Sequence, residues 1–98
     1  MRIEKKKDGA ALMVSLAGRL DTVTALELEA ALSDLEGVQE LVLELGALEH
    51  TSSAGLRALL LLHKKMAAQG KMKLKNVTPA VLDVLKMANF TKFLTIEA

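Results

Sequence analysis

The sequence predicts an α/β fold in which helices cover a mixed, largely parallel sheet. Two observations carry this prediction. Segments with apolar residues at every second position alternate along the chain with segments at helical spacing, and an opening hairpin precedes this alternation. The predicted order is therefore β-β-α-β-α-β-α-β. The 98 residues have the length of one domain, which we expect to span residues 1–98.

The N-terminal segment predicts the hairpin. We expect residues 3–7 to form a strand, although only Ile3 is apolar, and its lysines suit an exposed sheet edge. Asp8-Gly9 is a common hairpin turn. Residues 11–17 then alternate, and we expect Gly18 to end this second strand. The apolar face of the second strand carries Leu12, Val14 and Leu16.

The first helix and the central strand follow. Thr24-Ala-Leu-Glu27 matches a capping box, which predicts the start of the helix, and Gly37 predicts its end. Residues 41–45 are nearly all apolar, as in a central strand, and we expect Gly46 to loosen the end of that strand. The buried stripe of the helix consists of Leu28, Leu32 and Leu35.

The C-terminal half predicts two more helices and two strands. A helix is expected over residues 53–69, and alternating residues predict a strand over 71–75. Thr78 and Pro79 together predict the start of the third helix, with threonine as the cap. The last strand is short and contains Leu94 and Ile96.

Composition narrows the possible classes of protein. Hydrophobic residues make up 51% of the chain and aromatic residues only 2%, so the core must consist of Leu, Val, Ile, Ala and Met. The absence of cysteine excludes disulfides and cysteine metal sites, which suits a reducing cytoplasm. The charged N-terminus lacks a signal peptide, and the apolar stretches are too short to cross a bilayer. We therefore expect a cytoplasmic protein without membrane insertion.

Charge is divided unevenly along the chain. Residues 21–49 contain eight acidic residues and no lysine or arginine, whereas residues 57–98 contain eight basic residues and two acidic ones. Such a division can guide the docking of a partner, or it can reflect two differently solvated faces.

The predicted boundary between a strand and a helix near residue 52 is the most informative site. Ser52 and Ser53 fall at the expected helix N-terminus, where free N–H groups and the helix dipole favour a negative group. A serine in this position can cap the helix, act as a nucleophile, or accept a phosphate. The residue pattern alone leaves all three roles open.

Catalysis finds little support in the sequence. Ser53-Ala-Gly55 matches the second half of a nucleophile elbow, but no complete acid–base set accompanies it. His50 is close in sequence, and His63 lies roughly 15 Å further along the expected helix. We therefore expect no enzyme and no catalytic residue.

Ligand-binding motifs are missing as well. The two histidines lack the spacing of metal ligands, and no glycine-rich phosphate loop is present. The basic C-terminal half has only Phe90 and Phe93 for base stacking and matches no recognised nucleic-acid module. We expect no metal, no cofactor and no direct binding of nucleic acid.

Three motifs occur in order along the chain. The first is Gly18-Arg-Leu-Asp21, before the first expected helix, and the second is the segment from Leu43 to Arg57, which contains Ser52-Ser53-Ala54-Gly55. The third is Asn76-Val-Thr-Pro, at the start of the third expected helix. Together they resemble the motifs of the STAS domain family, the sulphate transporter and anti-sigma factor antagonist domains, and the second resembles the family signature. The resemblance covers nearly the whole chain and implies the same order of elements.

For stand-alone bacterial members, the resemblance implies a phosphorylation switch. The unphosphorylated protein would bind an anti-sigma factor that is a serine kinase, and this would free a sigma factor for transcription. Phosphorylation would release the complex, and a phosphatase would reset it. The phospho-acceptor position falls on Ser53. The implied partner-binding residues are Asp21, Thr22, Thr51, Ser52, Ser53 and Gly55.

The chain also departs from the family pattern. Ser52 stands where an aspartate is frequent, Glu44 replaces an aspartate late in the third strand, and His50 takes an aromatic position. A second hypothesis is therefore that the chain is a STAS subunit without a phosphorylation cycle. Such a subunit would dock in a multiprotein complex, such as a lipid-transport ATPase, through the same surface.

Overall fold

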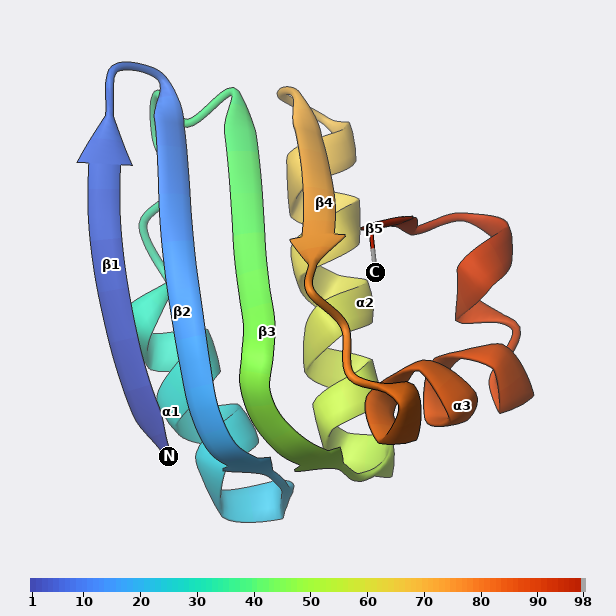
Figure 1. Cartoon of the computed structure of the whole chain (residues 1–98). Helices are drawn as coiled ribbons and strands as arrows, with labels where there is room; N and C mark the ends of the chain where they lie inside the picture. The colour runs from blue at the N-terminus through green and yellow to red at the C-terminus, as the bar shows by residue number, and fades with distance from the viewer. Residues whose placement is uncertain (98) are drawn as a thin grey trace.

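The structure is a computed structural model that describes residues 1–97. A five-stranded sheet has the order β1-β2-β3-β4-β5, with β1 antiparallel to β2 and all other neighbours parallel (Figure 1). The predicted fold class and order of elements are confirmed, and a short 3-10 helix, η1, precedes the last strand. The elements are β1 Arg2–Asp8, β2 Ala11–Leu20, α1 Thr22–Ala31, β3 Glu40–Thr51, α2 Ser53–Ala67, β4 Lys71–Lys75, α3 Pro79–Met87, η1 Phe90–Lys92 and β5 Thr95–Glu97.

The helices cover the sheet unequally. Figure 1 shows α1 and α2 side by side behind the sheet, while α3 lies beside the lower end of β3. The carboxyl ends of β2, β3 and β4 point towards this lower edge, where α1, α2 and α3 begin. The arrangement therefore brings the N-termini of three helices to one edge of the sheet.

The core lies between the sheet and the helices and is made mainly of leucine. The alternating residues Leu41, Leu43 and Leu45 of β3 are completely buried. The buried apolar side chains are Leu, Val, Ala and Met, in agreement with the expected composition. Neither phenylalanine is fully buried, since Phe90 is half-buried and packs against the core and Phe93 is exposed.

Strands β2 and β3 are longer than the sequence predicts. β2 continues through Gly18 to Leu20, and β3 continues through Gly46 to Thr51. The pairing shifts twice between the two strands, at Ser15/Ala17 and at Gly18/Arg19. These bulges let β3 take up extra residues without breaking its ladder. The predicted strand ends were wrong because each glycine lies within a strand and not after it.

Helix α1 also differs from the prediction. It begins at Thr22 with Asp21 as its cap, so the predicted capping box of Thr24 and Glu27 was wrong. It ends at Ala31, and Gly37 adopts a φ of 81° in the loop that follows. The predicted stripe is buried nevertheless, because Leu32 and Leu35 in that loop still reach the core.

The remaining elements follow the sequence prediction closely, except that β5 begins at Thr95, so Leu94 lies just before the strand. α2 starts at Ser53 as expected and ends two residues early, at Ala67. Thr78 caps α3 and Pro79 is its first residue. β1 lies at one edge of the sheet, as its lysines predict.

Candidate functional site at the first turns of α1 and α2

The ends of β2 and β3 hold the first residues of α1 and α2 side by side. Leu20, the last residue of β2, pairs with Thr51, the last residue of β3. The backbone N–H of Ser52 then donates to the carbonyl of Leu20 at 2.9 Å. Each strand passes into its helix through one capping residue, so the two helix N-termini open at the same place.

The N-terminus of α1 is capped by a carboxylate. Asp21 Oδ1 accepts the N–H groups of Val23 at 3.1 Å and Thr24 at 3.0 Å. In return, the N–H of Asp21 donates to the Thr24 hydroxyl at 2.7 Å. The N–H and then the hydroxyl of Thr24, followed by the N–H of Val23, hold the pKa of Asp21 below its ordinary value of 3.8. A fixed negative charge therefore occupies this helix end.

The N-terminus of α2 is capped by a neutral hydroxyl. Ser52 Oγ accepts a single N–H, that of Gly55, at 3.4 Å, which is near the limit for such a bond. Ser53 is the first helical residue and is exposed. The first turn of α2 contains no acidic residue. The positive end of this helix dipole thus has no carboxylate of its own turn to oppose it.

Thr51 and Gly55 lie beneath Ser52 and Ser53 and set the position of α2. Thr51 is only 2% exposed, and its hydroxyl donates to the carbonyl of Ser52 at 3.3 Å. A Cβ atom on Gly55 would lie 2.3 Å from Thr51 Oγ1 and 2.8 Å from Leu20 Cγ. Only glycine lets the helix approach the strand ends this closely.

The predicted partner-binding residues therefore form one cluster with two layers. Asp21 and Ser52 are half-buried, whereas Thr22 and Ser53 are exposed, so these four can meet a partner. Thr51 and Gly55 are buried and support them from below.

A groove runs from this cluster between α1 and α2. Its first part has a volume of about 740 Å³, and Thr22 and Ser53 are among the residues that line it. The groove also contains Arg57, to which the sequence analysis assigned no role. The four-residue spacing from Ser53 to Arg57 was the signal that could have shown it, since residues so spaced share a helix face.

Neither of the two histidines is hydrogen-bonded to Ser53. His50 is half-buried on β3 and pairs with Arg19 of β2. His63, also half-buried, packs its ring against Phe93 with centroids 5.1 Å apart. Among residues 1–97, no hydrogen bond joins a serine to either ring.

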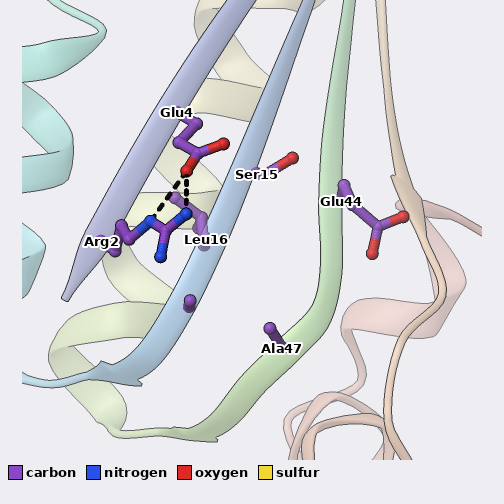
Figure 2. A pocket seen from close by; sticks show the side chains of 7 residues that line it. Arg2, Glu4, Ser15, Leu16, Glu44 and Ala47 are labelled. Atoms are coloured by element: carbon purple, nitrogen blue, oxygen red, sulfur yellow. Dashed lines mark hydrogen bonds and ion pairs between the residues drawn. The ribbon is translucent and has the colours of Figure 1, made fainter.

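A separate hollow lies on the opposite face of the sheet, which α1 and α2 leave uncovered. Figure 2 shows Arg2 bonded to Glu4 on β1, with Ser15 on β2 and Glu44 on β3 further along. Glu44 accepts the N–H of Gly46 at 2.7 Å and the side-chain amide of Asn76. Glu44 thus links the bulge of β3 to the segment after β4. The charged groups of this hollow have local partners, in contrast to the α1–α2 groove.

Within the described part of the chain, no three histidine or acidic side chains gather in a way that could hold a metal ion. None of the helices described for residues 1–97 is long and apolar enough to cross a membrane.

Comparison with known proteins places these features in a family. The model of the STAS domain matches residues 2–98. BtrV of Bordetella bronchiseptica, which is named as an anti-sigma factor antagonist, is 34% identical over 93 residues. That match covers 92% of this chain and 80% of BtrV.

Solved structures share the fold. An anti-sigma factor antagonist from Thermotoga maritima superposes with a TM-score of 0.91 at 18% identity, covering 98% of this chain and 86% of that one. The phosphorylated form of SpoIIAA from Bacillus gives a TM-score of 0.77 at 17% identity, covering 99% and 92%. These identities are low, so the superpositions establish the fold alone. BtrV is named as a regulator and not as an enzyme, which agrees with the expectation from sequence.

Proposed function

The chain belongs to the STAS domain family, and from this premise we propose that it is a cytoplasmic antagonist of an anti-sigma factor, switched by phosphorylation of Ser53. The unphosphorylated protein binds an anti-sigma factor that is also a serine kinase, and a sigma factor is thereby freed. The kinase phosphorylates Ser53 and the complex separates. A phosphatase then restores the binding form.

The observation that carries this proposal is the exposed position of Ser53 at an N-terminus without an acidic residue. Ser52 performs the capping, so the hydroxyl of Ser53 is not needed for the helix. A kinase can reach the Ser53 side chain because it is exposed. The helix dipole favours a negative charge there by about 0.3–1 kcal/mol, so a phosphate is compatible with the fold.

The same phosphate opposes a docked partner. It adds about −1.5 to −2 charges at neutral pH to a surface that must lose its water on binding. A charge left buried and unpaired at an interface costs about 2–5 kcal/mol. At about 1.4 kcal/mol per factor of ten, affinity falls roughly 30-fold to several thousand-fold. The switch therefore requires no change of fold.

The neighbouring residues support a partner surface around Ser53. Thr22 and Ser53 line one groove, and Asp21 holds its charge beside them. The capping bonds fix Asp21, so its carboxylate is presented to a partner in a defined position. Thr51 and Gly55 hold the α2 end in register with it.

The experiment is incubation of the protein with ATP and an anti-sigma factor serine kinase from the same organism, with detection of the phosphate by mass spectrometry. We expect one phosphate, located on Ser53 and abolished by Ser53→Ala. The matched control is Ser52→Ala, which removes the adjacent hydroxyl and should still accept the phosphate.

Tight binding without any phosphate would overturn the switch. That result would instead support a docking subunit without a phosphorylation cycle, such as a subunit of a lipid-transport ATPase. The same surface would then serve as a permanent interface.

A further inference from the structure

One continuous trough begins at Ser53 and follows α2. The hollow that contains Ser53 and a second hollow further along share Glu29 and Leu61. The second hollow extends to Lys65, near the last turn of α2. The trough therefore spans most of the length of α2.

The trough exposes large apolar side chains. Leu26 of α1 is 66% exposed and Leu61 of α2 is 43% exposed, and both line the hollow that contains Ser53. Apolar side chains gathered along a groove between two helices are typical of surfaces that take the apolar face of a third helix.

Arg57 is the cation nearest to Ser53 along this trough. It lies four residues after Ser53 on the same helix and lines the same hollow. Side chains so spaced have their Cβ atoms about 5–6 Å apart. Arg57 is exposed, and within residues 1–97 its guanidinium forms no ion pair, the three pairs present being elsewhere.

We propose that Arg57 anchors the partner in this trough and that a phosphate on Ser53 competes for the same guanidinium. In the unphosphorylated protein, Arg57 binds a carboxylate on an apolar helix of the anti-sigma factor. This inference rests on the proposed function and names the chemistry of its partner.

Charge complementarity supports an acidic partner helix. The charged side chains that line the two hollows comprise three cations and one carboxylate, namely Arg57, Lys64, Lys65 and Glu29. The apolar face of a partner helix would pack against the apolar side chains of the trough. A carboxylate near the end of that helix would pair with its cations. Continuity with Ser53 lets a single phosphate affect this binding.

Phosphorylation would act on the anchor directly. Arginine forms strong, often bidentate hydrogen bonds with both carboxylates and phosphates, and a phosphoserine offers three acceptor oxygens. A phosphate one helical turn from Arg57 is held close to it by the helix itself. The partner's carboxylate then loses its counter-charge and also meets the phosphate's negative charge.

The first test needs no partner. Phosphoserine is introduced at position 53 during translation, and the second ionisation of the phosphate is followed by 31P NMR in low salt. We expect the pKa to be about 0.5 units lower with Arg57 than in Arg57→Gln, because a unit charge at about 6 Å in water has that effect.

The matched control is Lys64→Gln, which removes the same charge eleven residues from Ser53, or roughly 16 Å along the helix axis. This pKa should equal that of the unsubstituted phosphoprotein. Equal values for Arg57→Gln and the unsubstituted phosphoprotein would overturn the competition for Arg57.

The second test measures the affinity of the unphosphorylated protein for the kinase by calorimetry. Arg57→Gln should weaken binding about tenfold or more, and Leu26→Ala should weaken it by a smaller factor. The control Lys75→Gln, on β4, should leave the affinity unchanged. Full affinity in Arg57→Gln would overturn the anchor. If the unsubstituted protein fails to bind the kinase, the proposed function fails, and the NMR comparison still decides whether Arg57 holds the phosphate.

Discussion

The N-termini of α1 and α2 lie side by side, but α1 is capped by a charged residue and α2 by a neutral one. At α1, the Asp21 carboxylate accepts two backbone N–H groups, and Thr24 returns a bond to the backbone of Asp21. At α2, the Ser52 hydroxyl accepts one N–H at 3.4 Å. The chain therefore supplies a negative charge at one helix end and leaves it out at the other.

This difference gives the two ends different capacities. The α1 end is already neutralised by a fixed carboxylate, so it can present charge to a partner but gains nothing from a second anion. The α2 end can accept a negative charge that arrives later on Ser53. An aspartate in place of Ser52 would make the two ends alike, whereas serine keeps them distinct.

The largest effect on stability is expected where the two ends are held together. Gly55→Ala should lower the free energy of unfolding by about 1–3 kcal/mol, because overpacked side chains must move. The added Cβ would lie 2.3 Å from Thr51 Oγ1. Urea denaturation measures the loss. Thr51→Ala removes the clashing hydroxyl, so the double variant should lose less unfolding free energy than the two single variants added together. A loss equal to that sum would refute the clash.

Removing the neutral cap should have a smaller effect. Ser52→Ala should cost about 1 kcal/mol of unfolding free energy, since α2 loses the acceptor for the N–H of Gly55. Chemical denaturation of Ser52→Ala and Ser53→Ala side by side provides the check. Ser53 bonds to no backbone N–H, so its substitution should cost less. An equal loss in both would show that Ser52 is not the cap.

Making the α2 end resemble the α1 end should stabilise the protein slightly. Ser52→Asp should add about 0.3–1 kcal/mol, because a carboxylate then faces the helix dipole. The same change should raise the second pKa of a phosphate on Ser53 by like-charge repulsion. Thermal denaturation and 31P NMR measure the two effects. A lower melting temperature in Ser52→Asp would contradict the inference that the N-terminus of α2 lacks a stabilising negative charge.

The smallest effect concerns pH. The folded-state pKa of Asp21 is lowered, so its contribution to stability is present above its ordinary value of 3.8 and is lost as pH falls through the folded pKa. The stability difference between the wild type and Asp21→Asn should therefore shrink from pH 7 to pH 3. Ser52 does not titrate, so the difference for Ser52→Ala should stay constant. A constant difference for Asp21→Asn would rule out a charged cap.

Local sequence patterns predicted the elements well but not the ends that shape the site. Thr24 and Glu27 match a capping box, yet Asp21 lies three residues earlier and accepts the N–H of Thr24. The Asp21 carboxylate is the stronger acceptor and caps the helix, and the Thr24 hydroxyl accepts the N–H of Asp21 in return. Two competing caps within one turn cannot be ranked from spacing alone.

Strand ends depended on pairing between distant segments. Gly46 resembles a strand end, but the bulge between β2 and β3 carries the ladder past it to Thr51. Such a shift depends on both strands and has no local signal. The position of Ser53 was predictable because the helix start has a local signal. The role proposed for Arg57 could be inferred only once α1 was placed beside α2.

The most direct measurement is the affinity of the kinase for the protein with and without a phosphate on Ser53, with the fold followed by NMR. We expect phosphorylation to weaken binding at least 30-fold, while backbone shifts change only around the first turn of α2. Ser53→Asp should weaken binding in the same direction by less, because it carries one charge. Equal affinity of both forms, with the fold intact, would contradict the proposal that Ser53 controls docking through its charge.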